Sequence, residues 1–178
     1  MANSVKWALD PAHSELQFKV KHLVISTVTG SFNIFNGELQ ANENNFDGGT
    51  VSFQADVNSI NTGNGQRDEH LRSADFFDAA NFPQMSFEGT ELKRVDEENY
   101  SLAGNLTIRG TTKPVTLQVA FGGITKDPWG NTKAGFEVTG KLNRKDFGLA
   151  WNALTEAGGV VVSEEVKIIA NVQFAKTA

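Results

Sequence analysis

The stretch ELQFKVK at residues 15–21 decides the fold class of this chain. Its apolar side chains Leu16, Phe18 and Val20 alternate with polar or charged neighbours. Successive side chains of a β-strand point to opposite faces, so a period of two places these three on one face. The stretch therefore predicts an antiparallel strand with one face in a core and the other in water.

The same alternation returns along most of the 178-residue chain. It covers residues 51–57, 100–108, 115–121, 136–142 and 166–174, and less regular runs lie at 32–39 and 85–92. Together these segments predict about eight half-buried strands. An open sheet would leave exposed edges, whereas closure into a barrel removes them and can enclose one small ligand. We therefore expect an all-β fold, an eight-stranded antiparallel barrel, as a single domain over residues 1–178.

Short turns separate the strands. Asp47-Gly48-Gly49 is a hairpin signal, and so is the sequence DPWGN at residues 127–131. Links this short favour an up-and-down order, in which consecutive strands are neighbours. The apolar parity slips between Ile34 and Phe35, which predicts a bulge or a sharp bend there.

One long segment, residues 61–83, breaks the strand pattern. Residues 66–72 are predicted to form a short helix after two glycines, and residues 73–80 a second short helix. The aromatic side chains Phe76, Phe77 and Phe82 cannot all face water, so we expect them to cap one end of the barrel. A long interruption in a compact barrel is often functional.

Composition excludes several classes of partner and site. The formal net charge is −5, with an isoelectric point near 5.2. An acidic chain without a basic cluster argues against nucleic acid and against an anionic membrane surface. The absence of cysteine excludes disulfides and thiolate metal sites. No run is apolar enough to span a bilayer, so stable membrane insertion is not expected. The chain as written shows no signal peptide, which predicts the cytoplasm, or the periplasm if such a peptide has been removed.

Two polar features are candidates for chemistry. The three histidines, His13, His22 and His70, do not have the spacing of a known metal motif, so we expect no metal and no cofactor. The polar cluster at residues 67–72 includes Arg67 and His70. It is either a solvated helix face or a polar rim able to hydrogen-bond a ligand head group.

Several runs in fixed order carry a family resemblance. They are DPAHS at residues 10–14 with Phe18 and His22, GSF at 30–32, RDEHLRS at 67–73, DFFD at 75–78 with Phe82-Pro83, GNLTIRG at 104–110 with Thr112-Lys113, RKDFG at 144–148, and Val166. Spanning about residues 5–175, they resemble the YceI-like family of polyisoprenoid-binding proteins with a lipocalin-like barrel. The resemblance implies an internal tunnel for a lipid with an isoprenoid chain, such as a quinone or a polyprenyl phosphate, and frequent dimerisation. It supplies no catalytic residue.

Three functions are compared. The first is a non-enzymatic protein that binds a long apolar or amphipathic lipid for transport, storage or sequestration. The second is a structural or partner-binding β protein whose core is filled, which the 13 phenylalanines would also explain. The third is a hydrolase-type enzyme using His22 or His70.

The lipid-binding function predicts a set of ligand-binding residues. Those on the apolar parity of their strands are Leu16, Phe18, Val20, Phe32, Phe53, Phe87, Leu106, Phe136 and Ile168. Phe76 and Phe77 are expected at the barrel end, with Arg67 and His70 beside them. Continued alternation places His22 inward at the end of its strand, as a contact for the head group or as a structural histidine.

A homodimer is expected chiefly from the family resemblance. Trp129 is an independent indication, because it lies at a predicted hairpin tip and tryptophan is enriched at interfaces. The alternative is that the Trp129 ring folds back over its own barrel.

Overall fold

The computed structural model describes residues 4–22, 25–42, 45–149 and 163–177. Within them, eleven β-strands form one antiparallel sheet. The strands are β1 (Ser4–Leu9), β2 (Glu15–His22), β3 (Ser26–Phe32), β4 (Phe35–Asn42), β5 (Asn45–Asp56), β6 (Ile60–Asn61), β7 (Gln84–Arg94), β8 (Asn99–Ile108), β9 (Thr111–Lys126), β10 (Thr132–Asn143) and β11 (Glu165–Lys176). The helix is α1 (Gly65–Arg72), with 3₁₀ turns at Pro11–His13, Val57–Ser59 and Arg144–Phe147. No helix in these ranges has the length and hydrophobicity needed to cross a membrane.

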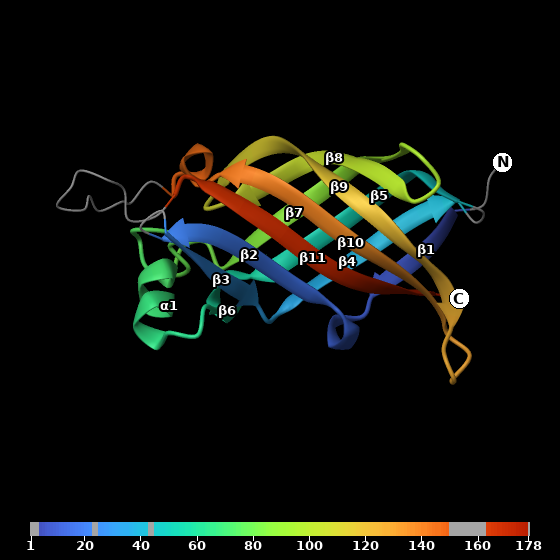
Figure 1. The fold of residues 1–178 in the computed structure, drawn as a ribbon, viewed down its shortest axis with the longest axis horizontal. Helices are drawn as coiled ribbons and strands as arrows, with labels where there is room; N and C mark the ends of the chain where they lie inside the picture. The colour runs from blue at the N-terminus through green and yellow to red at the C-terminus, as the bar shows by residue number, and fades with distance from the viewer. Residues whose placement is uncertain (1–3, 23–24, 43–44, 150–162, 178) are drawn as a thin grey trace.

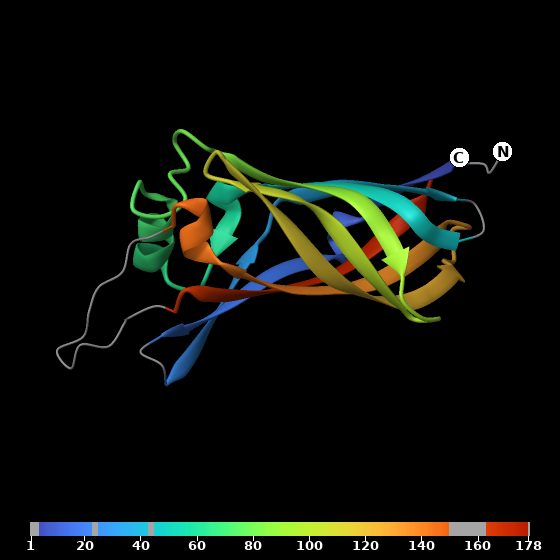
Figure 2. The same ribbon diagram turned by 90° about the horizontal axis from the view of Figure 1, so that it is seen from above.

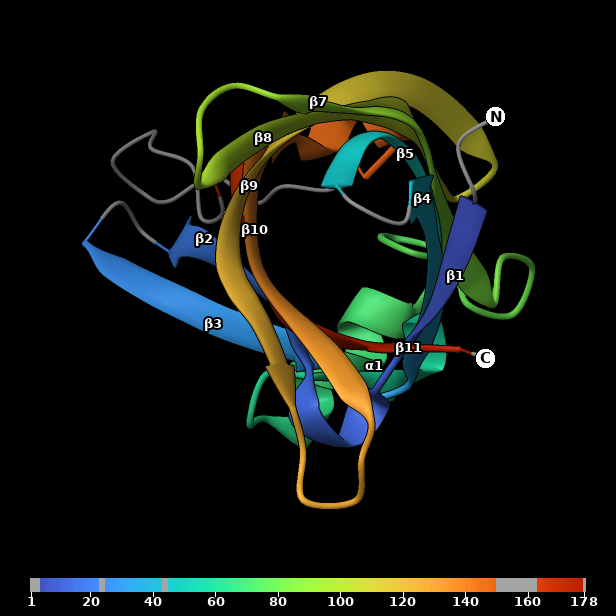
Figure 3. The same cartoon turned by 90° about the vertical axis from the view of Figure 1, so that its right-hand side faces the viewer.

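The sheet closes on itself because β1 pairs with β11 as well as with β4. β1 and β2 share one position in the barrel, since both pair with β11. β3 and β4 share the next position beside them, and β6 continues β5 beside β3. With the five strands from β7 to β11, the described residues form an eight-position barrel in up-and-down order, which Figure 3 shows end on. The predicted eight-stranded antiparallel barrel is therefore confirmed.

Two interruptions let the long strands curve around the barrel. The first is the 3₁₀ turn Pro11–His13 between β1 and β2. The second is the break between β3 and β4, where Ile34 is exposed and Phe35 is buried again. The bend predicted between Ile34 and Phe35 is confirmed.

Of the two predicted hairpins, one is confirmed and one is wrong. Residues 127–131 connect β9 and β10, where the Asp127 carboxylate accepts hydrogen bonds from the backbone N–H groups of Trp129 and Asn131. Asp47-Gly48-Gly49 instead lies inside β5, because the chain reverses between Asn42 and Asn45. Gly48 has φ +81°, and the β5–β7 register shifts just after Gly49. The glycines thus serve a bulge rather than a turn.

The predicted helix at residues 66–72 is confirmed as α1, but the second helix at 73–80 is wrong. The Ser73 hydroxyl and backbone N–H both donate to the His70 carbonyl, which ends α1. Asp78 then adopts φ +50°, in the left-handed region, so the segment continues as hydrogen-bonded turns. α1 and the 3₁₀ turn Arg144–Phe147 lie at the same end of the barrel, opposite the chain termini (Figures 1 and 2).

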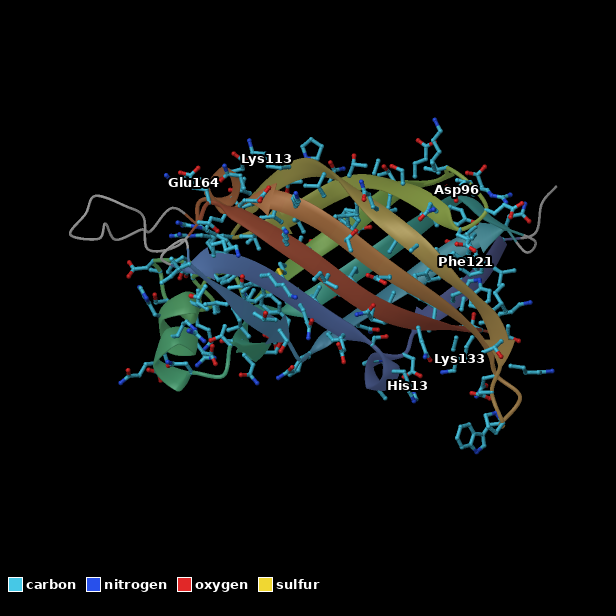
Figure 4. All side chains as sticks on the ribbon, viewed as in Figure 1. His13, Asp96, Lys113, Phe121, Lys133 and Glu164 are labelled. Carbon is cyan, nitrogen blue, oxygen red and sulfur yellow. The ribbon has the colours of Figure 1, made fainter. Side chains whose placement is uncertain are left out.

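A half-buried ion pair fastens the β1–β2 interruption to β10. The Lys133 ammonium donates to Asp10 Oδ2 at 2.6 Å, and His13 Nδ1 donates to the same oxygen at 2.8 Å. Figure 4 shows His13 and Lys133 close together below the barrel. Hydrogen bonds from Lys133 and then His13 lower the pKa of Asp10 from 3.8 to about 2, against the opposing effect of burial.

Replacing Asp10 with asparagine tests this clamp. A carboxyl whose pKa is lowered in the folded state stabilises fully above its unfolded pKa and loses the effect as pH falls through the folded value. Asp10→Asn keeps a side-chain acceptor for the 3₁₀ turn, so we expect a loss of about 1–2 kcal/mol at neutral pH. The loss should shrink between about pH 4 and pH 2. Urea unfolding of both proteins across this range measures it.

Glu38→Gln is the matched control, because Glu38 forms an exposed pair with Lys6 at 3.7 Å. Its effect should stay within about 0.5 kcal/mol. An Asp10→Asn deficit that does not change with pH would contradict the electrostatic explanation.

Candidate ligand-binding cavity

The barrel encloses a cavity of about 590 Å³. Its wall is built mainly by leucine, valine, isoleucine and phenylalanine side chains from strands all around the barrel. A volume of this size is typical of small-molecule sites. The filled-core interpretation of the phenylalanine-rich composition predicts an interior without such a space.

The structure brings thirteen of the fourteen predicted site residues together on this wall. They are Leu16, Phe18, Val20, Phe32, Phe53, Arg67, His70, Phe76, Phe77, Phe87, Leu106, Phe136 and Ile168. His22 is the last residue of β2, paired with Ser26, but its side chain lies outside the described part of the structure. That these residues bind a ligand stays a prediction.

Strand register explains why the sequence parity located the wall. In β8, Leu102, Leu106 and Ile108 are all buried, and Leu106 lies opposite Phe87 of β7. Gly104 shares their face, and a Cβ atom there would come within 2.6 Å of the Phe87 ring. Glycine at this position therefore leaves room for the aromatic side chain that faces the cavity.

The cavity opens at the α1 end of the barrel. Asn64, Gln66 and Arg67 belong to its wall and are also exposed to solvent, so the cavity reaches the surface there. Arg67 Nε and Nη2 donate to the Thr62 hydroxyl and carbonyl oxygens, both at 2.7 Å. The Asp68 carboxylate accepts from the Thr62 hydroxyl at 2.6 Å and from its backbone N–H at 2.9 Å. These bonds fasten α1 to the segment that leaves β6.

Two phenylalanines close part of this end, as predicted. Phe76 is buried and lies edge-on to the His70 ring at 5.2 Å between centroids, while Phe77 is edge-on to Phe32 at 5.8 Å. His70 Nε2 is 2.9 Å from the Asp75 carboxylate. Phe82 was predicted to share the cap, but it packs outside the cavity wall, against Gly110 of the β8–β9 turn.

Sequence reasoning missed two arginines at the mouth. Arg144 is only 3% exposed, lines the cavity, and donates to the carbonyls of Ser163 and Leu149. Its guanidinium carbon lies 5.9 Å from the centre of the Phe76 ring. Arg109 Nη1 donates to the carbonyls of Phe76 and Gly148 at 3.0 Å and so positions the cap. Each arginine follows a strand in a polar sequence, so nothing local indicated burial or a contact with the cap.

The charged side chains of the cavity wall have one sign. Burial lowers the pKa of the Arg144 guanidinium, and nearby Glu164 opposes the shift, so Arg144 stays charged at neutral pH. Among the described residues of the wall, the charged side chains are Arg67 and Arg144, with His70 beside them, and none is a carboxylate. The described ranges also contain no group of three histidine, aspartate or glutamate residues placed to hold a metal ion.

These features define a lipocalin-like barrel with an apolar internal cavity and two arginines, Arg67 and Arg144, in the wall at its mouth. The chain belongs to the YceI-like domain family, whose model matches residues 7–174. The "UPF0312 protein YE1254" of Yersinia enterocolitica is 41% identical to it over 161 residues, which is 90% of this chain and 80% of that relative. A "UPF0312 protein" of Yersinia pestis matches to the same extent.

Solved structures share the fold. The YceI protein of Campylobacter jejuni is 31% identical, with a TM-score of 0.76 over 89% of this chain and 90% of its own. A domain of Saccharophagus degradans, described as a polyisoprenoid binding domain implicated in plant cell wall breakdown, is 16% identical with a TM-score of 0.73, over 96% and 98% of the two chains. At that identity the second comparison shows the fold alone.

A larger side chain in the cavity wall should block the binding of an apolar ligand. Leu106→Trp places an indole in the bore opposite Phe87, so we expect the affinity for an apolar fluorescent dye to fall by about tenfold or more. Asn105→Trp is the matched control, because residue 105 is exposed on the outer face of the same strand. Dye titration of the three proteins measures the effect. Equal binding by all three would show that the dye does not enter the barrel.

Proposed function

We propose that the protein binds a long apolar or amphipathic lipid in its barrel cavity, for transport, storage or sequestration. The proposed tail is a polyisoprenoid, as in a quinone or a polyprenyl phosphate. The observation that carries the proposal is the apolar wall of a cavity of about 590 Å³ that opens at one end. The binding described for the Saccharophagus domain supports the same class of ligand.

The energetics favour recognition through the tail. A methylene group is about as large as a water molecule, whose share of the liquid is about 30 Å³, so the cavity has room for on the order of 20 chain carbons. Each buried CH₂ contributes roughly 0.8 kcal/mol, and a five-carbon isoprene unit therefore about 3–4 kcal/mol before the cost of ordering the chain. A few units are enough for tight binding with modest help from the head group.

The head group is proposed to lie at the mouth, where α1 supplies the polar part of the wall. Arg67 is exposed there, and its Nη1 has no partner among the described residues. His70 and Arg144 flank the Phe76 ring deeper in the wall. His22 stays a proposed contact from its position at the end of β2. A polar head at this place keeps its contact with water while the tail is buried.

Neither alternative function explains the cavity as well. A filled-core structural protein has no need of an open apolar interior. A hydrolase-type enzyme needs polar groups converging on a reacting atom, whereas His70 is bonded to Asp75 at the mouth and the bore beyond it is apolar. We therefore propose a binding role without catalysis.

The contribution of each part of the lipid can be measured separately. We expect a polyprenyl alcohol, phosphate and quinone of one chain length all to bind, because the shared tail dominates. Arg67→Gln should weaken binding of the phosphate about 2- to 10-fold and leave the alcohol unchanged. Titrations followed by native mass spectrometry give the three affinities.

Arg94→Gln is the control, since it removes the same charge from an exposed arginine at the end of β7. If the alcohol and quinone fail to bind the wild type, tail-dominated recognition is wrong. If Arg67→Gln weakens all three ligands equally, Arg67 has no role in recognising the head group.

A homodimer is also proposed, from the family and from Trp129. The alternative that Trp129 folds back over its own barrel is wrong, because the side chain is 82% exposed at the tip of the β9–β10 hairpin. Static light scattering should give a dimeric mass for the wild type at micromolar concentration and a lower mass for Trp129→Ala. A monomeric wild type would remove the dimer, and a dimeric variant would remove only the role of Trp129.

A further inference from the structure

An aromatic plug lies at the end of the barrel away from α1. It consists of Trp7 (β1), Phe46 (β5), Tyr100 (β8), Phe121 (β9), Phe136 (β10) and Phe174 (β11), whose neighbouring rings have centroids 5.2–6.5 Å apart. Figure 4 labels Phe121 at this end, close to Asp96 and opposite the α1 end. Phe136 and Phe174 also belong to the cavity wall. The plug is therefore the floor of the cavity.

Phe46 is the centre of the plug. Its ring centroid lies 5.5 Å from that of Trp7, 5.3 Å from Phe121 and 5.2 Å from Phe136. These partners come from three other strands, so Phe46 bridges the width of the bore. It is only 4% exposed and is not itself part of the cavity wall, which ends on the near side at Phe136.

The Asp47-Gly48-Gly49 motif has its role here. It follows Phe46 directly, and the bulge that it makes includes Gly48 at φ +81°. A Cβ atom on Gly49 would come within 2.9 Å of the Phe46 carbonyl oxygen. The two glycines thus allow the tight backbone path that starts β5 and holds Phe46 across the barrel.

Trp7 adds size to the plug at the cost of a polar group that the described residues leave unsatisfied. The indole N–H is buried and finds no acceptor within the part of the chain that the structure describes. A buried donor without an acceptor costs stability, and phenylalanine at residue 7 would avoid that cost. What tryptophan adds is size, because it fills more of the bore behind Phe46.

We propose that the plug sets the longest lipid tail that the cavity accepts, with Phe46 as the residue that determines this length. The inference rests on the proposed function, since it assumes a tail that enters at the α1 mouth. A tail shorter than the distance from mouth to plug gains affinity with every added unit, because each unit is buried. A longer tail leaves its excess in water and gains nothing.

A series of prenols that differ only in length tests whether the plug sets a length limit. For the wild type, we expect affinity to rise by at least about tenfold per added isoprene unit among short prenols such as geraniol and farnesol. It should then stop rising before solanesol. Phe46→Ala removes the centre of the plug, so its affinities should continue to rise for at least one longer prenol. Competition by native mass spectrometry measures all members of the series together.

Phe147→Ala is the matched control, because Phe147 is a fully buried phenylalanine at the α1 end and lies outside the cavity wall. It should keep the wild-type length limit. The proposed length limit is overturned if wild-type affinity rises with every added unit. The role of Phe46 is overturned if Phe46→Ala and Phe147→Ala both keep the limit. In either case the proposed function still stands. If no prenol binds the wild type, the proposed function and the proposed length limit are both wrong.

Trp7 supplies a second measurement that does not depend on how well Phe46→Ala folds. The chain has three tryptophans, so replacing Trp129 and Trp151 with phenylalanine leaves Trp7 as the single indole. Prenols shorter than the limit should leave its fluorescence unchanged, and those that reach the plug should shift it. A shift that is the same for every prenol length would contradict a floor at Phe46.

Discussion

Closure of the sheet through the β1–β11 pairing is the constraint on which the rest of the structure depends. It turns one face of every strand toward a common interior, and alternation then decides which side chains meet there. An eight-position barrel is just wide enough either to be filled by side chains or to hold one small ligand. In this chain side chains do not fill the barrel, because apolar faces of the strands line a cavity of about 590 Å³.

The two ends of the bore differ in chemistry. At the α1 end, Arg67, His70 and Arg144 surround a wall that reaches solvent, and Arg109 holds the Phe76 segment in place. At the opposite end the aromatic plug is closed, and its polar groups are the Trp7 N–H and the Tyr100 hydroxyl. A ligand with one polar end and one long apolar end fits this asymmetry in one orientation, with its head at the mouth and its tail toward Phe46.

The period-two pattern was enough to predict the barrel and much of its interior. Leu16, Phe18 and Val20 line the cavity. Side chains of a strand alternate between its two faces, so the apolar residues of one parity mark the face that turns inward. The pattern also placed the bend after Ile34, since a bend in a long strand resets the parity of the residues that follow.

Features that depend on contacts between distant segments were not predictable in this way. Arg144 begins the 3₁₀ turn after β10, and its guanidinium donates to the carbonyl of Leu149 and to that of Ser163, which comes from the segment before β11. The prediction of a second short helix at residues 73–80 was wrong because Asp78 adopts a left-handed conformation while Phe76 and Phe77 turn inward. The position of Phe46 inside the barrel was not predicted, because the adjacent Asp47-Gly48-Gly49 motif fits a turn and a bulge equally well.

The central claim is that the barrel interior is a lipid site rather than an unfilled core. Native mass spectrometry of the protein, purified without detergent or added lipid and then offered a polyprenol, tests it most directly. The account predicts one lipid bound per chain, either retained from the host or taken up from the added polyprenol, with a mass that fits an isoprenoid. A protein that carries nothing and takes up no polyprenol would contradict it.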